Sequence, residues 1–457
     1  MFKSVYITFI LLLSLSVISC GSGGNGSSGS SEDSETSISE VVRSEKIVST
    51  YFSFASLNSD GSVTTWGNSE WGGDSSKVRS QLNNVLEIYS TNSAFAAIKK
   101  DGTVVSWGDN GGDSSDIEEE LHDISRVVAS NGGFAALRND GKVFTWGYPY
   151  NYSEENTAPI ISEVTHLAAS YSTFSAIKSD GTVVTWGSDS LGSYVPAIEE
   201  LVNYAPESDI LVPNAIDGYA AKLGSGDVVT WGNSASTTGF SPESVINALK
   251  IMSSGRGFVA LLPSGEAKYW GVQYTSSWSV SPPSSLSNVK DIVFGEWSDA
   301  VALLDDGTLV TWGSYGNPSV FPTTWEQLDD FPKTLMNTVE IYKGRRDGSG
   351  GSNFGAVDEF GNAYSWGSTP NPDESITNVD YLELSSSAVA ALKDDGKVVY
   401  WGRVEVEFDL DTLKPLIDPL LVDVEAIYSS GVSFSAIRSD GSIVTWGKFV
   451  NDGIVEF

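Results

Sequence analysis

The stretch FAAIKKDGTVVSWG, residues 95–108, is the clearest copy of a block that recurs along most of the chain. The block ends in Trp-Gly, and it occurs ten times with no insertion in the twelve residues before its tryptophan. The mean period, (446 − 66)/9, is about 42 residues, which is typical of a repeat architecture built from one small structural unit. The ten tryptophans are Trp66, Trp107, Trp146, Trp186, Trp231, Trp270, Trp312, Trp366, Trp401 and Trp446.

A glycine stands five residues before the tryptophan in all ten copies, and an aspartate precedes it in seven. Asp-Gly between two runs of alternating apolar residues predicts a two-residue type I′ hairpin, in which both central residues have positive φ. Each repeat therefore contains a hairpin. We interpret these aspartates as turn formers and not as catalytic or metal-binding acids.

Small and large apolar residues alternate on both sides of the turn. Ten residues before the tryptophan stands Ala in nine copies and Ser56 in the first, and twelve before it stands an aromatic residue in eight. A third apolar segment precedes the hairpin, as in VLEIYST, residues 85–91. Period-two alternation indicates strands packed tightly against a neighbouring sheet, so each unit has three strands, or four. We expect the repeated Trp and Phe side chains to form the core.

The block, written FxALxxDGxVxxWG, resembles the repeat of the regulator-of-chromosome-condensation family, whose members form β-propellers. The resemblance covers about residues 47–457. The eukaryotic members have longer repeats, usually seven, and a Gly-x-x-His segment that is absent here. The short period is similar to that of secreted bacterial propellers that inhibit β-lactamases by protein contact. The departures give no basis for expecting nucleotide exchange or histone binding.

The predicted fold is an all-β, β-propeller-like toroid of ten repeats over residues 47–457. Ten units exceed the usual four to eight blades. A closed or nearly closed ring is favoured, since closure removes exposed sheet edges, but an open spiral or units outside the ring stay possible. We expect the tail, residues 453–457, to add a strand to the first blade.

The amino terminus predicts export. Residues 1–19 combine Lys3 with a short apolar run, the layout of a signal peptide. Val17-Ile18-Ser19-Cys20 resembles the lipobox of bacterial lipoproteins, which implies an acylated Cys20, and the following Gly21 implies the outer membrane. An ordinary signal peptide is the alternative. Residues 20–46 are rich in Gly, Ser and acids and read as a flexible tether. Because Cys20 is the single cysteine, a disulfide within the chain is excluded.

Charge narrows the choice of partners. The 457 residues contain 26 Lys and Arg against 59 Asp and Glu, for a formal net charge of −33. Such a chain is repelled by phosphate backbones, so we expect no nucleic-acid partner.

Specificity is expected in the segments that vary between repeats. Those joining the first strand to the hairpin would surround the axis on one face. Asn92, Asn131 and Asn214 in them are compatible with a glycan ligand, and ordinary exposed loops are the alternative. Aromatic and Arg side chains dominate protein interfaces. The candidate partner-binding residues are therefore Tyr51, Phe52, Tyr171, Arg256, Trp297, Arg345 and Arg346.

The chain shows no catalytic motif. It has two histidines, His122 and His166, no Gly-x-Ser-x-Gly and no His-Glu-x-x-His. We therefore predict no enzyme activity, no cofactor and no metal site, and expect a lipid-anchored envelope protein that binds a protein partner. A glycan-binding propeller is the alternative, followed by a carbohydrate-active enzyme or a purely structural envelope role.

Overall fold

The computed structural model divides the chain between Val41 and Val42 into two units, and all described residues belong to the second. It describes residues 44–147, 161–187, 211–213, 218–223, 226–232, 245, 247–253, 257–271, 286–295, 300–312, 335, 337–344, 353–367, 369, 372, 374–402, 410–447 and 454–456. None of the helices formed by these residues is long and apolar enough for a membrane crossing.

The described residues of the second unit form ten antiparallel sheets, each made of strands consecutive in the sequence. The first five are β1 (Ser44–Ser49), β2 (Ser53–Asn58) and β3 (Val63–Gly67); β4 (Val85–Ser90), β5 (Ala94–Lys99) and β6 (Val104–Gly108); β7 (Ile124–Ala129), β8 (Gly133–Arg138) and β9 (Val143–Gly147); β10 (Val164–Ala169), β11 (Thr173–Lys178) and β12 (Val183–Gly187); β13 (Leu211–Pro213), β14 (Gly218–Lys222) and β15 (Val228–Gly232).

The other five sheets follow the same plan, and the last has a fourth strand. They are β16 (Lys250–Ser253), β17 (Gly257–Leu261) and β18 (Ala267–Gly271); β19 (Val289–Phe294), β20 (Ala300–Leu304) and β21 (Leu309–Trp312); β22 (Thr338–Lys343), β23 (Asn353–Asp358) and β24 (Ala363–Gly367); β25 (Val379–Leu384), β26 (Ala388–Lys393) and β27 (Val398–Gly402); β28 (Val424–Ser429), β29 (Ser433–Arg438), β30 (Ile443–Gly447) and β31 (Ile454–Glu456). The described helical segments are η1 (Ser69–Trp71), η2 (Ser115–Glu120), α2 (Leu410–Ile417) and η7 (Asp418–Leu420).

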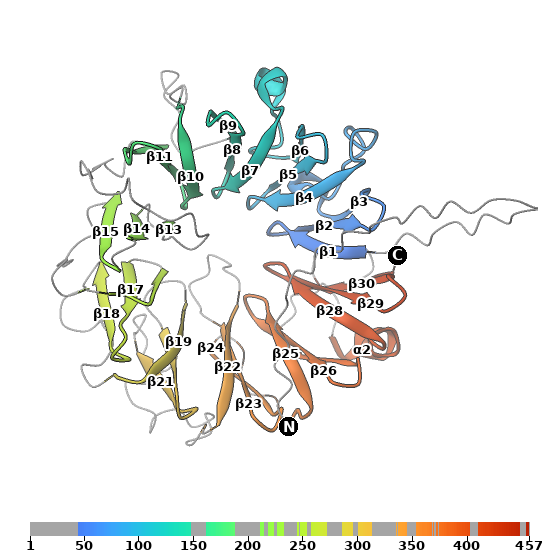
Figure 1. Ribbon diagram of the computed structural model, residues 1–457. Helices are drawn as coiled ribbons and strands as arrows, with labels where there is room; N and C mark the ends of the chain where they lie inside the picture. Colours follow the sequence, from blue (N-terminus) through green and yellow to red (C-terminus); the bar gives the residue numbers. More distant parts are fainter. Residues whose placement is uncertain are drawn as a thin grey trace, which may run out of the picture. The chain divides into compact units, whose positions relative to one another are not determined.

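Consecutive sheets pack face to face around a ring, with the first strand of each sheet toward the centre (Figure 1). A hydrophobic cluster joins each neighbouring pair: one, for example, combines Ala55 of β2 with Ile88 of β4 and Phe95 of β5. This arrangement confirms the predicted all-β, propeller-like fold of ten repeats. β1 begins at Ser44, slightly ahead of the predicted boundary at residue 47.

The repeated aromatic residues fill the spaces between sheets, as predicted. Phe95 and Trp107 stack with ring centroids 5.2 Å apart, and Phe434 and Trp446 repeat the pair at 5.5 Å. The alanine of the middle strand, such as Ala97, has no exposed surface. A small residue is required there because the large rings lie alongside it.

The hairpin turn differs from the predicted type I′ turn. Gly102 N–H donates to the Lys99 carbonyl at 2.9 Å, and Gly102 has φ of +80°, whereas Asp101 is not among the residues with positive φ. This is a type I turn followed by a left-handed glycine. The Asp101 carboxylate accepts the Thr103 N–H at 3.0 Å, which confirms its role as a turn former.

Among the described residues, this glycine joins its sheet to the next in eight repeats. The Gly102 carbonyl accepts the Ile124 N–H at 2.9 Å, and a Cβ added to Gly102 would lie 3.0 Å from the Asp123 Cα. Asp123 itself has φ of +54°, and its carbonyl accepts the Asn139 N–H at 3.0 Å. The contact recurs around the ring, so main-chain hydrogen bonds connect the hairpin turns on one face of the ring. We name this face the hairpin face.

The ring is closed. Trp66 Nε1 donates to Thr445 Oγ1 at 2.9 Å, and Ser49 Oγ donates to the Ser429 carbonyl at 3.0 Å. Ile437 and Ile443 of the last sheet share a buried cluster with Trp66. The first and last sheets are thus neighbours like any other pair, as Figure 1 also shows. The favoured closed toroid is confirmed.

The prediction that the carboxyl-terminal tail adds a strand to the first blade is wrong. The tail adds a strand to the last sheet. β31 pairs antiparallel with β30, with Trp446 opposite Ile454 and Val444 opposite Glu456. The outer edge of β30 is the nearest open edge to the end of the chain. Side-chain packing and the two hydrogen bonds above already join the first and last sheets, so closure needs no shared strand.

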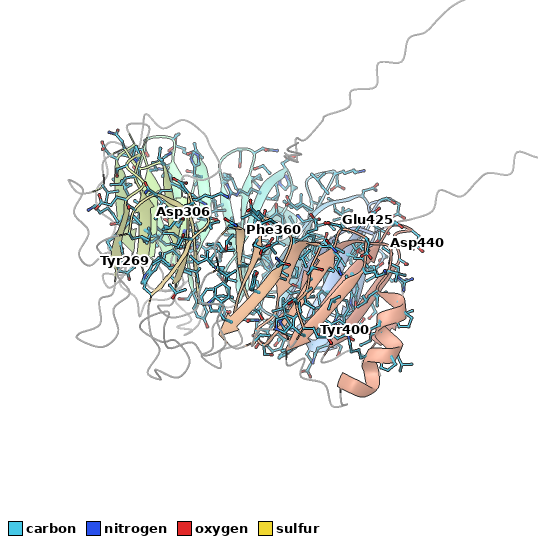
Figure 2. All side chains as sticks on the ribbon, turned by 90° about the horizontal axis from the view of Figure 1, so that it is seen from below. Tyr269, Asp306, Phe360, Tyr400, Glu425 and Asp440 are labelled. Carbon is cyan, nitrogen blue, oxygen red and sulfur yellow. The ribbon has the colours of Figure 1, made fainter. Side chains whose placement is uncertain are left out.

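Figure 2 shows Asp306, Phe360 and Asp440, from three different hairpin turns, along one side of the ring, and Tyr400 toward the other.

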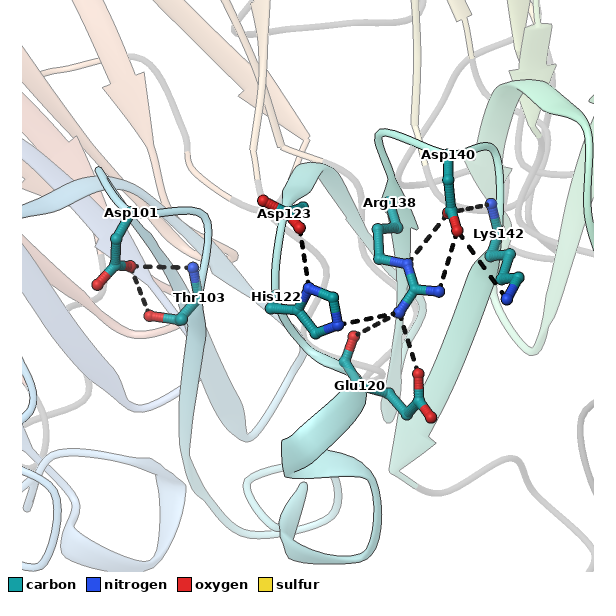
Figure 3. Close-up of polar contacts among 8 residues, drawn as sticks. All are labelled: Asp101, Thr103, Glu120, His122, Asp123, Arg138, Asp140 and Lys142. Carbon is teal, nitrogen blue, oxygen red and sulfur yellow. Dashed lines mark hydrogen bonds and ion pairs between the residues drawn. The ribbon is translucent and has the colours of Figure 1, made fainter.

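At another of these turns, Arg138 is only 8% exposed and binds the Asp140 carboxylate through Nε at 3.1 Å and Nη2 at 3.0 Å (Figure 3). Its Nη1 also reaches Glu120 Oε2 at 3.0 Å. These bonds tie η2 to the β8–β9 hairpin of the sheet that follows it.

We predict that Gly102→Ala destabilises the protein by about 1–2 kcal/mol, because alanine in the left-handed region is strained and its Cβ would press on Asp123. Chemical unfolding followed by tryptophan fluorescence measures this. Lys100→Ala, one position away from the turn aspartate and exposed, is the control and should stay within about 0.5 kcal/mol of the wild type. Equal stability of the two variants would contradict the role of Gly102 in joining the two sheets.

The Arg138 ion pair gives a pH-dependent prediction. Hydrogen bonding to Arg138 lowers the pKa of Asp140 to about 2, below its ordinary value of 3.8. Its stabilising contribution is therefore complete above about pH 4 and is lost as the pH falls toward 2. We expect the difference in Tm between wild type and Asp140→Asn to be largest near neutral pH, to shrink as the pH falls below about 4, and to vanish only below about pH 2. Arg138→Met should remove the same pH-dependent difference, and a difference that persists at low pH would refute the assignment.

Candidate functional site

The connections between the first and second strands lie on the side of the ring opposite the hairpin face, which we name the loop face. In five of them a Ser or Thr hydroxyl accepts a main-chain N–H three residues later: Thr91 Oγ1 accepts from Ala94 at 2.9 Å and Ser130 Oγ from Gly133 at 3.0 Å, for example. The same pairs are closed by main-chain bonds, Thr91 N–H to the Ala94 carbonyl among them. Such a hydroxyl turn fixes the loop by bonding a side chain to the main chain of the same loop.

The residue after this hydroxyl, fifteen before the tryptophan, forms a main-chain belt across the loop face. Tyr51 N–H donates to the Asn92 carbonyl at 2.9 Å, Asn92 to Asn131 at 3.0 Å, and Asn131 to Tyr171 at 2.9 Å. On the other side, Gly431 N–H donates to the Tyr51 carbonyl at 3.2 Å. The belt holds the side chains of neighbouring sheets at fixed spacing.

Two of the predicted partner-binding residues meet in one aromatic cluster. Tyr51 and Phe52 pack edge to face at 4.5 Å, and Phe52 packs against Trp71 at 4.6 Å. All three side chains are half-buried. The Tyr51 ring also lies against Gly431, where an added Cβ would approach it to 2.7 Å. The cluster therefore offers aromatic surface that is held in place from beneath.

Trp71 belongs to the site, although no repeat pattern distinguishes it from the other tryptophans outside the repeated block. Thr50 Oγ1 donates to its carbonyl at 3.0 Å, and Ser53 Oγ donates to the Asn68 carbonyl at 2.7 Å. The segment after Trp-Gly thus starts on the same face as the loops. Antiparallel pairing requires this, because the third strand ends beside the start of the second strand. The hairpin predicted from the sequence could therefore have placed the segment after Trp-Gly on the loop face.

Tyr171 is placed where predicted, half-buried at the end of the described belt. The remaining predicted partner-binding residues, Arg256, Trp297, Arg345 and Arg346, lie outside the described residues, as does the predicted lipidation residue Cys20. The structure thus brings Tyr51 and Phe52 together and puts Tyr171 on the same face through the belt.

Asn92 and Asn131 lie between these aromatic residues. Asn92 is exposed and Asn131 half-buried, and Asn92 Nδ2 donates to Asn131 Oδ1. The sequence pointed to both as compatible with a glycan but gave no indication that they touch, because 39 residues separate them.

The innermost strands carry charges that pair between neighbouring sheets. Lys46 Nζ lies 3.6 Å from Glu87 Oε1, and Lys250 Nζ lies 3.0 Å from Asp291 Oδ1. Burial, and then the charge of Arg126, lowers the pKa of His166. These ion pairs connect the first strands of neighbouring sheets, and we assign them a structural role.

The two histidines each contact polar groups close to them in the fold. His122 Nδ1 lies 2.9 Å from Asp123 Oδ2, and its Nε2 faces Arg138 Nη1 at 3.3 Å (Figure 3). His166 Nδ1 lies 3.0 Å from Thr165 Oγ1 on the neighbouring residue. Among the described residues, no group of three or more His, Cys, Asp and Glu could hold a metal ion.

No family model and no curated protein matches the chain. Solved structures with partial likeness include the CRINKLY WD40 ectodomain of the Arabidopsis thaliana receptor kinase ACR4, with 16% identity over 61% of this chain and 99% of that one and a TM-score of 0.35. Yeast RCC1 (Prp20) bound to Kap60 has 14% identity over 86% of this chain and 79% of that one, with a TM-score of 0.31. The computationally designed Ika8 protein has 13% identity over 79% and 97%, with a TM-score of 0.32. At these values function has to be inferred from the residues of this chain.

Proposed function

We propose that this protein is a non-catalytic binding protein of the cell envelope that captures a protein partner on its loop face. The aromatic cluster of Tyr51, Phe52 and Trp71 is the observation that carries the proposal. Aromatic side chains supply large contact area with few rotatable bonds and are enriched among the residues that dominate binding energy. Their partial exposure leaves surface for a partner.

The main-chain belt supports the same proposal through preorganisation. Association is weakened when loops must be ordered on binding. Here the loops at Tyr51, Asn92 and Asn131 are already held by the belt and by hydroxyl turns. A partner would meet a surface whose backbone is fixed. The acidic chain, with a formal net charge of −33, disfavours nucleic acid as that partner.

Cys20 would anchor this ring to a membrane. In the proposal the leader, residues 1–19, is removed and Cys20 is acylated, with residues 20–46 as a tether rich in Gly and Ser. More than one acyl chain is needed for stable anchoring, and the lipobox-like sequence implies that the residue carries several. The outer membrane is the proposed location.

A polysaccharide is the second candidate ligand. The contact between Asn92 and Asn131 favours it, since paired amides between aromatic residues suit sugar hydroxyls.

We expect Phe52→Ala combined with Trp71→Ala to weaken partner capture by about thirtyfold, which corresponds to the loss of about 2 kcal/mol typical of central aromatic residues. The measurement is quantitative pull-down from envelope extract with the immobilised protein, with unfolding checked by circular dichroism. Leu86→Ala combined with Phe360→Ala removes two residues that are 61% and 68% exposed, Phe360 being on the hairpin face, and is the matched control. If the control variant loses capture and the Phe52 and Trp71 variant does not, the interface lies away from the aromatic cluster.

The anchor is tested by Cys20→Ala. In a bacterial host with lipoprotein processing, we expect wild-type protein in the detergent-rich phase after Triton X-114 partition and the variant in the aqueous phase, because the acyl chains supply the membrane affinity. Mass spectrometry of the amino-terminal peptide should show acylation in the wild type only. An unmodified Cys20 in correctly exported protein would refute the anchor and leave the proposed interface untouched.

A further inference from the structure

The segment that follows β3 lies against the neighbouring sheet. Trp107 Nε1 donates to the Gly72 carbonyl at 3.0 Å, and a Cβ added to Gly72 would lie 3.8 Å from the Gly108 Cα. Trp71 and Asp109 directly adjoin these two glycines in the sequence. The first two sheets are neighbours in the ring, as Figure 1 shows. The aromatic cluster of the first sheet therefore borders the loop of the second sheet that begins at Asp109.

An acidic residue lies on each side of this border, on a backbone that is already fixed. Glu70 is exposed beside Trp71, and its N–H donates to Asn68 Oδ1 at 2.9 Å. Asp109 is also exposed, and its N–H donates to the Ser93 carbonyl at 3.1 Å while its carbonyl accepts the Ser93 hydroxyl at 3.2 Å. Both carboxylates therefore reach solvent next to the aromatic cluster.

The two carboxylates keep their negative charge uncompensated by the described part of the chain. At the hairpin face an acid is typically matched by a base, as where Arg138 Nη2 lies 3.0 Å from Asp140 Oδ2. Among the described residues, no ion pair involves Glu70 or Asp109, and the Asp109 carboxylate accepts only from the neutral Asn110 Nδ2, at 2.9 Å. The loop-face segments of the first two sheets contain four acids and no Lys or Arg. These segments are residues 50–53, 68–74, 91–93 and 109–115.

Partly exposed aromatic rings beside uncompensated carboxylates favour a cation. The face of an aromatic ring attracts Lys and Arg side chains, and the indole of Trp does so most strongly. Arg suits such a surface better than Lys, because its planar guanidinium stacks on a ring, is more weakly hydrated, and can bond a carboxylate through two N–H groups. Tyr51, Phe52 and Trp71 supply the rings, and Glu70 and Asp109 supply the carboxylates.

We propose that these five residues form an aromatic–acidic patch that binds a basic segment of the protein partner, with an Arg side chain stacked on the rings. The inference rests on the proposed function and adds the chemistry of the partner. A second copy of this chain does not fit that chemistry, because two surfaces of a chain with formal net charge −33 repel each other.

The test is fluorescence anisotropy of the full chain in non-ionic detergent with three labelled peptides. The first is Gly-Ser-Arg-Gly-Arg-Ser-Gly, and the others carry lysine or citrulline in place of both arginines. At low salt we expect the arginine peptide to bind with Kd below about 1 mM and the lysine peptide about threefold more weakly. Citrulline keeps the shape of arginine without its charge, so its peptide should bind at least about tenfold more weakly. Equal binding of the arginine and citrulline peptides overturns the proposal.

Two variants with the same change in net charge locate the site. Glu70→Gln with Asp109→Asn should weaken binding of the arginine peptide at least about tenfold. Glu118→Gln with Glu119→Gln removes two exposed charges from η2, outside the patch, and should change Kd by less than about twofold. If both variants weaken binding equally, the net charge of the chain attracts the peptide and the patch is refuted.

Two further measurements examine the stacking and the nature of the ligand. Phe52→Ala with Trp71→Ala should remove the preference for arginine over lysine, because the stacked guanidinium loses its ring. An unchanged preference would refute the stacking. Spermidine should displace the labelled arginine peptide less effectively than the unlabelled peptide does. If spermidine competes better, the patch takes a small polycation and the basic protein segment is refuted.

The outcomes separate this inference from the proposed function. If the arginine peptide fails to bind, or binds without dependence on Glu70 and Asp109, while protein capture still depends on Phe52 and Trp71, the inference is wrong and the proposed function stands. If the peptide binds through Glu70 and Asp109 but no protein is captured from envelope extract, the proposed function is wrong and the preference of the patch for basic peptides stands.

Discussion

Main-chain hydrogen bonds that pass from one sheet to the next hold both faces of the ring together. On the hairpin face a left-handed glycine such as Gly102 gives its carbonyl to the N–H of Ile124 in the following sheet. On the loop face Tyr51, Asn92, Asn131 and Tyr171 form the belt. A three-stranded sheet cannot bury its apolar faces alone, so each depends on being held against its neighbours. The glycine is essential because it supplies both a positive φ and the space for close approach.

The stacked aromatic residues supply the apolar part of the same contacts. Eight of the ten repeat tryptophans stack on an aromatic ring of their own sheet, as in Phe54–Trp66 at 5.5 Å. Several indoles donate to the sheet before. Trp66 donates to Thr445, Trp186 to Thr145 and Trp401 to Ser365. In each case the acceptor directly precedes the tryptophan of the preceding sheet. The bond between Trp66 and Thr445 is therefore an ordinary contact between neighbours that happens to close the ring.

The hydrogen bonds between neighbouring sheets explain why the loop face suits binding. Side chains on this face stand on a backbone that is already bonded to both neighbouring sheets, so their spacing is set before any ligand arrives. Tyr51 belongs both to the aromatic cluster and to the main-chain belt, and its ring rests on Gly431 of the last sheet. The ring closure is thus also what places the amino-terminal and carboxyl-terminal repeats in one surface.

Sequence alone determined the local units: the period, the strands, the hairpin and the aromatic core all follow from short-range patterns around each Trp-Gly. The turn type was mistaken because Asp-Gly serves both a type I′ turn and a type I turn followed by a left-handed glycine, and a flanking residue decides between them. A Ser or Thr before eight of the ten tryptophans was a further signal, since in several repeats its hydroxyl accepts an indole N–H in the structure. Only the tertiary structure decided that the tail joins β30, that Trp71 packs on Phe52, and that Asn92 meets Asn131. Those contacts join residues brought together by ring closure and by the stacking of separate sheets, and no sequence pattern within one repeat encodes a distance between repeats.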